Sequence, residues 1–210
     1  MKIVILAVTK MQGDRICLAG INESNEWVRP VKRYPYHLEK SDLFNEKTNQ
    51  IIYENFNIVD IPLIKKLEKS PHSEDYIIGS NKIPTVISNL PIDKREKFLL
   101  EHSDNNLLKG HSEKPINKLL EKVNRSLVLI GPVKINYVVL EKDKTPRIHF
   151  EITAIYKSDR SLPCTDLKFR AFGRSILKAK NSQKVVLNSK QLTDILKTDK
   201  IFIGIGLTRE

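Results

Sequence analysis

An aromatic plane beside two guanidinium groups is the first feature of the sequence that could do chemistry. Trp27, the only tryptophan, opens a short β-prone run, and the two-residue period of a strand puts Trp27, Arg29 and Arg33 on one face. An indole stacks on a base and an arginine holds a phosphate, which is how single-stranded nucleic acid is commonly bound. A core position for Trp27 is the alternative. Pro30 cannot donate to a β-ladder, so it predicts a strand end, bulge or edge that leaves Arg29 and Arg33 facing a ligand.

A second group of cations lies toward the C-terminal end. Eight basic residues and one acidic residue fall between Arg160 and Lys190, so this segment carries seven of the eleven net positive charges. We expect a helix over about 167–180, with Asp166 as its N-cap. The basic residues of this helix that we expect to contact phosphates are Lys168, Arg170, Arg174 and Lys178, the last three at i, i+4 and i+8. A solvated helix face is the alternative reading of the same row.

Two acidic clusters could contact a ligand. Glu74 and Asp75 lie in a turn-rich segment, where they could bind a metal or act as acid and base, or could cap and face solvent. Cys164, Thr165 and Asp166 could place a nucleophile beside an acid, although a strand end followed by a helix cap explains them more simply.

No complete catalytic or metal motif is found. The five histidines show neither HExxH nor HxH spacing, and the two cysteines, Cys17 and Cys164, form no CxxC pair. No GxxxxGK[ST] loop exists, and Gly204-Ile-Gly206 has no helix after it that could hold a phosphate. The sequence therefore predicts a protein that is not an enzyme and that has no cofactor and no metal.

Composition limits the kind of partner. The chain has 210 residues and a net charge of +11, which favours a polyanion or an acidic protein surface. No run of about 18 apolar residues exists, and Met1 to Val8 is too short and strand-like for a signal peptide. We expect a cytoplasmic protein with no membrane partner.

The element pattern predicts a mainly β (α+β) protein made of two small barrels. Strands are expected over 2–10, 15–21 and the run from Trp27, then over 51–67 with a break at Pro62, and over 76–78 after a turn. Helices are expected over 93–102, with Asp93 as N-cap, and over 114–123.

From residue 126 the order is three strands (127–140, 147–156 and 161–164), the basic helix, a strand over 184–187, a helix capped by Ser189 and a strand over 201–207. That order is typical of an OB-fold. The predicted domains are a first OB-like barrel over 1–80, a helical connector over 81–125 and a second OB-like barrel with the basic helix over 126–210.

The chain also resembles the dual-OB-containing domain family. Four pieces carry the resemblance in order along the chain: Cys17 to Ile21 with Trp27 to Pro30, Pro71 to Tyr76, Arg147 to Phe150 with Cys164 to Phe169, and Ile205 to Arg209. The resemblance implies two OB barrels, a nucleic-acid- or nucleotide-binding role and a prokaryotic setting of genome defence or mobile elements. It places the recurring polar residues of the family on Trp27, Arg29, Glu74, Asp75, Thr165, Asp166 and Arg209.

Three functions of different classes follow. The first is a non-catalytic module that binds nucleic acid, single-stranded DNA or RNA, through its basic surface and aromatic side chains. The second is an interaction subunit that docks on an acidic protein partner within a multi-component defence system. The third is a nucleotide-recognising regulator or weak hydrolase in which Glu74, Asp75 and Asp166 face a metal.

Overall fold

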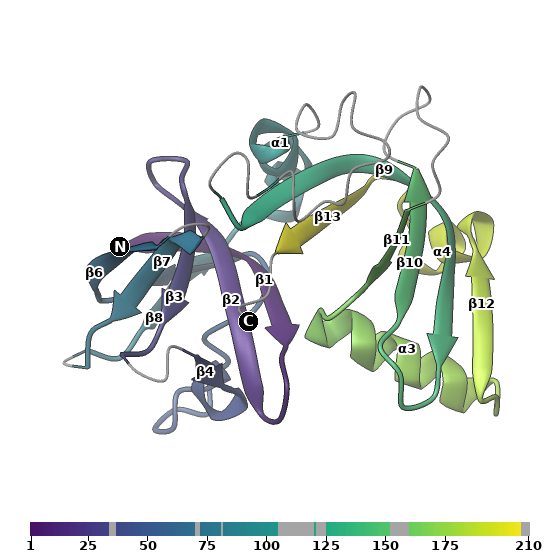
Figure 1. The fold of residues 1–210 in the computed structure, drawn as a ribbon, viewed down its shortest axis with the longest axis horizontal. Helices are drawn as coiled ribbons and strands as arrows, with labels where there is room; N and C mark the ends of the chain where they lie inside the picture. The colour runs from purple at the N-terminus through teal and green to yellow at the C-terminus, as the bar shows by residue number, and fades with distance from the viewer. Residues whose placement is uncertain are drawn as a thin grey trace. The chain divides into compact units, whose positions relative to one another are not determined.

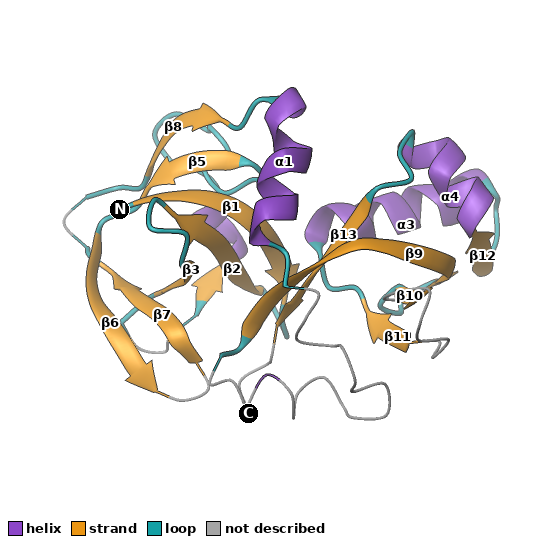
Figure 2. Ribbon diagram, turned by 90° about the horizontal axis from the view of Figure 1, so that it is seen from above, coloured by secondary structure: helices purple, strands orange, loops and turns teal. Residues whose placement is uncertain are grey.

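The fold is built on two curled β-sheets, each belonging to its own compact unit (Figures 1 and 2). The computed structural model describes residues 1–33, 37–69, 72–80, 82–104, 120, 125–151 and 160–206. Met1–His102 and the short segment around Ser126 and Leu127 belong to the first unit, and Leu129–Ile203 belong to the second. The predicted fold class, mainly β with two OB-like curled sheets, is confirmed. The predicted boundaries at residues 80 and 125 stay a prediction.

The first sheet has eight strands in the order β6-β7-β3-β2-β1-β5-β8, with β4 paired to β2. All pairs are antiparallel except β3 with β7, which run parallel. Apolar side chains of β1 and β2, such as Ile3, Ile5 and Leu18, are fully buried and form the core. The bounds are β1 Lys2–Lys10, β2 Arg15–Asn22, β3 Trp27–Val31, β4 Leu38–Glu39, β5 Asn57–Asp60, β6 Leu63–Lys69, β7 His72–Ile78 and β8 Thr85–Asn89, with a 3-10 turn η1 at Lys40–Leu43 and the helix α1 at Ile92–His102.

The hairpin that carries Trp27 is closed by one asparagine. The side-chain oxygen of Asn22 accepts hydrogen bonds from the backbone N–H groups of Ser24 and Glu26, both at 2.9 Å, and Asn25 takes a left-handed conformation with φ 61°. Asparagine favours such turns because its side chain substitutes for a backbone acceptor. The strands predicted over 15–21 and from Trp27 are thus confirmed, and they pair as this hairpin.

Four expectations for the first unit were wrong in detail. Residues 51–67 form no single strand: β5 begins at Asn57, and β6 follows the break at Pro62 to pair with a different strand. His72 to Asp75 belong to β7 and are not a turn. A strand, β8, lies within the predicted helical connector and pairs with β5. The helix α1 is confirmed, but it begins at Ile92, which puts Asp93 in its first turn. Of the helix predicted over 114–123, all but Leu120 lies outside the described residues.

The second sheet follows the predicted order of strands and helices. Its strands run β11-β10-β9-β12, all antiparallel, and β13 pairs with β9. Asn188, not Ser189, caps α4, because its side chain accepts from Gln191 N–H while the Gln191 side chain returns to the Asn188 backbone. The predicted strand residues 152–156 and 207 lie outside the described residues. The bounds are β9 Leu127–Glu141, β10 Arg147–Glu151, β11 Arg160–Pro163, α3 Leu167–Ala179, β12 Lys184–Asn188, α4 Ser189–Leu196 and β13 Ile201–Gly206.

One glycine of the first sheet permits a close approach between strands. A Cβ on Gly20 would meet the Val4 carbonyl oxygen and come within 2.6 Å of Ile3 Cγ2. Neither group can retreat, because both belong to β1 and Ile3 is fully buried. We therefore expect Gly20→Ala to destabilise the protein by about 1–3 kcal/mol through overpacking, measured by urea unfolding monitored by circular dichroism.

The matched control is Gly204→Ala, because a Cβ there would meet nothing within 4 Å. This variant should unfold at the wild-type urea concentration. Equal midpoints for the two alanine variants would show that the packing around Gly20 is looser than described.

Candidate nucleic-acid interface

The helix α3 presents the basic row and is set by its N-cap. Asp166 accepts a hydrogen bond from Phe169 N–H at 2.8 Å, which confirms the predicted cap. The apolar stripe faces the sheet, with Leu177 buried and Ile176 half-buried. Arg174 and Lys178 are exposed and flank this stripe, each one residue after a buried residue. The four-residue spacing separates successive members of the row by about 6 Å along the helix axis, which is comparable to the separation of neighbouring phosphates on one strand.

A glycine brings this helix close to the sheet. Gly173 is buried, and a Cβ there would lie 3.1 Å from Leu140 Cδ2 and 3.6 Å from Pro146 Cγ. Gly173 is therefore the point at which α3 packs on β9 and on the residue before β10. This close packing brings the basic row beside the β9–β10 turn.

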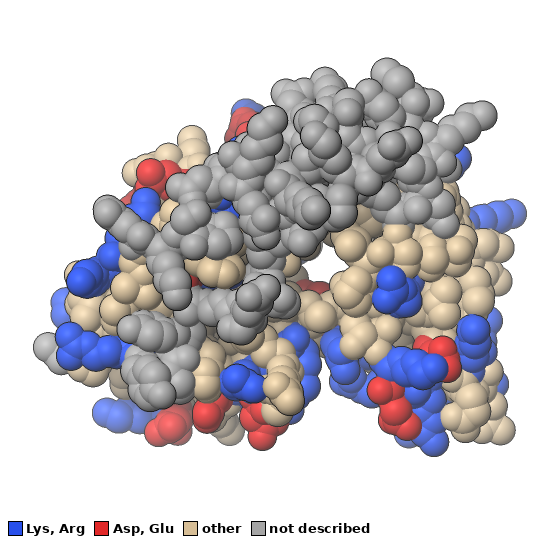
Figure 3. All heavy atoms as spheres, in the orientation of Figure 1, with Lys and Arg blue, Asp and Glu red and all other residues tan. Residues whose placement is uncertain are grey.

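The helix and the turn enclose a groove, which we call the basic groove. It has a volume of about 540 Å³ and lies entirely within the second unit. Figure 3 shows basic side chains, with a few acidic ones, at the lower end of this unit. Its lining residues are Leu140, Glu141, Lys142, Asp143, Lys144, Pro146, Arg170, Gly173, Arg174, Leu177, Lys178, Asn181, Ser182 and Gln183.

The electrostatic balance of the groove favours an anion. Five of its lining side chains are basic and two are acidic. Glu141 is neutralised by Lys144, whose Nζ lies 2.6 Å from its Oε1 and holds the pKa of this carboxyl below its ordinary value. Among the described residues no acid pairs with Lys142, Arg174 or Lys178.

The structure brings together three of the predicted cations and adds two that the sequence reading missed. Arg170 donates to Thr145 Oγ1 at 2.8 Å, which holds its guanidinium toward the β9–β10 turn. The two further cations are Lys142 and Lys144 of the β9–β10 turn, which the sequence analysis did not single out. Two strands separate this turn from the basic helix, so helical spacing could not reveal them. Lys168 is exposed but does not line the groove, and Arg209 lies outside the described residues.

The face expected to combine Trp27 with two arginines is not formed as predicted. Trp27 is half-buried, Arg33 is exposed beyond the end of β3, and Arg29 is only 4% exposed. The predicted edge position is wrong, because β3 lies between β2 and β7. Pro30 is tolerated in this inner strand because the pairing with β2 ends at Val28, so no N–H is needed on that side.

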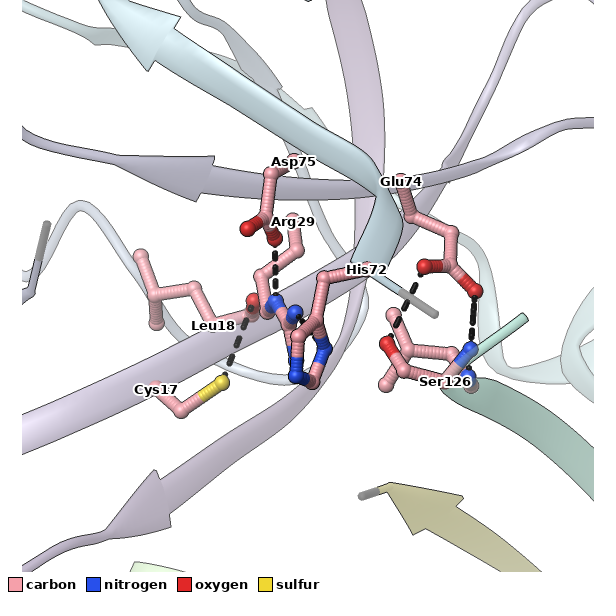
Figure 4. Close-up of polar contacts among 8 residues, drawn as sticks. Cys17, Leu18, Arg29, His72, Glu74, Asp75 and Ser126 are labelled. Carbon is pink, nitrogen blue, oxygen red and sulfur yellow. Dashed lines mark hydrogen bonds and ion pairs between the residues drawn. The ribbon is translucent and has the colours of Figure 1, made fainter. Parts of the chain in front are cut away.

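Arg29 and Asp75 form a buried ion pair instead (Figure 4). Arg29 Nε lies 2.5 Å from Asp75 Oδ1, and the two side chains are 4% and 3% exposed. The guanidinium also contacts His72 Nδ1, which must be the accepting nitrogen because arginine has only donors. The register pairs Arg29 with Asp75 across the parallel β3–β7 junction. The guanidinium is thus occupied inside the unit rather than presented at its surface.

Glu74 points to the other side of β7 and binds backbone (Figure 4). Its carboxylate accepts from Ser126 N–H at 2.7 Å, Ser126 Oγ at 3.0 Å and Leu127 N–H at 3.1 Å. Ser126 is fully buried, so these bonds satisfy donors that have no access to water. Both adjacent carboxylates thus have structural partners, which disfavours the metal-facing and acid-base reading of this corner.

Thr165 and Asp166 serve the beginning of α3. Thr165 is half-buried, and the Asp166 carboxylate is engaged as the cap. Burial raises the pKa of the neighbouring Cys164 thiol to about 11, against a smaller opposing effect of the hydrogen bond to the Asp166 backbone. A thiol that holds its proton is a poor nucleophile, so the strand-end and cap interpretation explains this segment better than a catalytic one.

These features define a class of mainly β protein whose two curled sheets are OB-like. The chain belongs to the dual OB-containing domain family, whose model matches residues 1–189. The matched range contains all residues that line the basic groove. No curated protein and no solved structure matches the chain. Small barrels of the OB type often bind oligonucleotides. No helix in the described part of the chain is long and apolar enough to cross a membrane.

The buried pair predicts a strong effect on stability. Arg29→Met leaves the Asp75 carboxylate buried without its cation, so we expect a loss of about 3–5 kcal/mol in the free energy of unfolding, measured by urea titration. Arg33→Met is the matched control, since Arg33 is exposed and should change stability by no more than about 0.5 kcal/mol.

Adding Asp75→Leu to Arg29→Met should restore much of the lost stability, because the unpaired charge is then removed. A double variant as unstable as Arg29→Met alone would show that the loss came from packing and not from the orphaned carboxylate.

The raised pKa of Cys164 predicts slow alkylation. At pH 8 its thiol is more protonated than an ordinary cysteine, so in a Cys17→Ser background iodoacetamide should label the folded protein far more slowly than the urea-unfolded one. The rate in the folded state should rise as the pH approaches 11. Equal rates for folded and unfolded protein at pH 8 would contradict the protected position of Cys164.

Proposed function

We propose that this protein is a non-catalytic nucleic-acid-binding module whose phosphate contacts lie in the basic groove. The observation that carries the proposal is the meeting of Arg170, Arg174 and Lys178 with Lys142 and Lys144 in one groove. Membership of an OB-containing family supports it, because such barrels often bind oligonucleotides. The net charge of +11 supports it as well, since a basic surface attracts a polyanion over a distance set by salt.

The shape of the groove fits an extended polyanion better than a small isolated anion. Its cations come from a helix and a turn that face each other, and an apolar floor of Leu140, Pro146 and Leu177 lies between them. Cations spread along a helix contact several phosphates in turn, and each contact releases a counterion. Affinity should therefore be strongly salt-dependent.

Replacing two groove cations tests the proposal. We expect Arg174→Gln and Lys178→Gln each to weaken binding of a fluorescein-labelled oligothymidylate, measured by anisotropy on the full chain. Each variant should lower the slope of log affinity against log salt by about 0.7, the value for one phosphate contact on a single strand. Far-UV circular dichroism should be unchanged, because both side chains are exposed.

Lys94→Gln is the control of equal charge change, because Lys94 is an exposed lysine on α1 and does not line the groove. Its slope should match that of the wild type. Loss of binding in all three variants to the same extent would show that net charge, and not the groove, governs affinity. A wild-type protein that binds no oligonucleotide at any salt but captures an acidic protein would favour a docking subunit.

A further inference from the structure

One face of the second sheet is turned to solvent and carries an ordered aromatic pair. Along β9, Val138 and Leu140 are fully buried, whereas the alternating Tyr137, Val139 and Glu141 are half-exposed. The helices α3 and α4 cover the buried face, as the contacts of Gly173 with Leu140 and the burial of Leu177 and Leu192 indicate. Tyr137, Val139 and Glu141 on the opposite face keep part of their surface accessible to a ligand.

Tyr137 and His149 stack on this open face. Their ring centroids are 4.0 Å apart and their planes differ by 17°. The two residues are register partners on β9 and β10, so the stack runs across the strands. The row continues to Ser161 on β11, whose hydroxyl lies 3.3 Å from His149 Nε2 and accepts from Arg147 Nε at 3.0 Å. These contacts fix the rings before any ligand arrives, which reduces the entropy lost on binding.

The second face of the Tyr137 ring is directed toward β12. His149 covers the side toward β10, and the register partner on the other side is Asn188. Next to Asn188 on this face stands Val186, a valine that is 51% exposed. The Asn188 side-chain oxygen is engaged as the cap of α4. A flat apolar group could therefore lie against the Tyr137 ring and also contact the Val186 side chain.

This place lies along the sheet from the basic groove. Glu141 lines the groove and is the register partner of Lys184, and the next pairs on the same face are Val186 with Val139 and Asn188 with Tyr137. Two residues of a strand advance about 6.6 Å, so the aromatic pair lies about 13 Å along the sheet from the groove. Arg147, an exposed cation, stands opposite Val139 along this path.

We propose that Tyr137, backed by His149 and flanked by Val186, is a base-stacking site that makes the ligand of the basic groove single-stranded. The proposal rests on the proposed function of the groove. The phosphates of one strand occupy the groove, and the chain then passes Lys184 and Arg147 so that a base lies on the second face of Tyr137. A base inside a duplex cannot stack on this ring, because both faces of the base are already stacked on neighbouring bases and the edge of the base is paired.

The test compares variants of the full chain for binding of fluorescein-labelled oligothymidylate. Tyr137→Leu should weaken binding by roughly 5- to 150-fold, the effect of losing one base–aromatic stack, while Tyr137→Phe should bind like the wild type. The salt slope should not change in Tyr137→Leu, because no phosphate contact is lost. With the wild-type protein, unlabelled duplex of the same length should displace the labelled oligonucleotide more weakly than unlabelled single strand does.

A second variant leaves the aromatic pair itself unchanged. Val186→Glu places a carboxylate at the exposed flank of the stacking site and should also weaken binding, whereas Ile195→Glu adds the same charge at a 42% exposed position on α4 and should not. Wild-type affinity in both Tyr137→Leu and Val186→Glu, with Arg174→Gln still impaired, would overturn the stacking site and leave the groove standing. Equal losses in Val186→Glu and Ile195→Glu would likewise overturn it. Failure of the wild type to bind any oligonucleotide would remove both proposals.

Discussion

The buried pair of Arg29 and Asp75 is the constraint on which the first unit depends. It joins the one parallel strand pair of an otherwise antiparallel sheet, and its two side chains are almost without contact with water. Removing two charges from water is costly, and the cost is offset only by good geometry and by further hydrogen bonds. The contact of the guanidinium with His72 supplies one such bond. The pair can form only when β3 and β7 are in register, so it specifies the pairing of strands that are remote in the sequence.

The two units use their charges in different ways. In the first, Arg29, Glu74 and Asp75 are all buried, and their ion pair and hydrogen bonds hold strands together. In the second, Arg174 and Lys178 stay exposed at the rim of a groove, and the cap of their helix is supplied by Asp166. Charges of the second kind cost little stability, because they remain in water, and they are available to a polyanion.

The sequence predicted much of the fold, because that part depends on local signals. Capping and apolar periodicity located α3 and β9, and the basic row appeared from helical spacing alone. The inner position of β3 could not be predicted, because it depends on the non-local parallel pairing with β7. Arg29 therefore looked like a surface residue. The stacking of Tyr137 on His149 was hidden for another reason: both strands were predicted, but the register that makes these two residues partners, twelve positions apart, was not.

The three hydrogen bonds that Glu74 accepts reduce the effect that loop length has on the stability of this chain. They tie β7 to the beginning of β9 across a sequence separation of 52 residues. The two ends of that segment are thus held together from within the core, whatever lies between them. The entropic cost of closing a loop rises only with the logarithm of its length, about 0.6 kcal/mol for each doubling. Lengthening the chain between α1 and Ser126 should therefore add little closure entropy, while the carboxylate of Glu74 keeps the beginning of β9 in place.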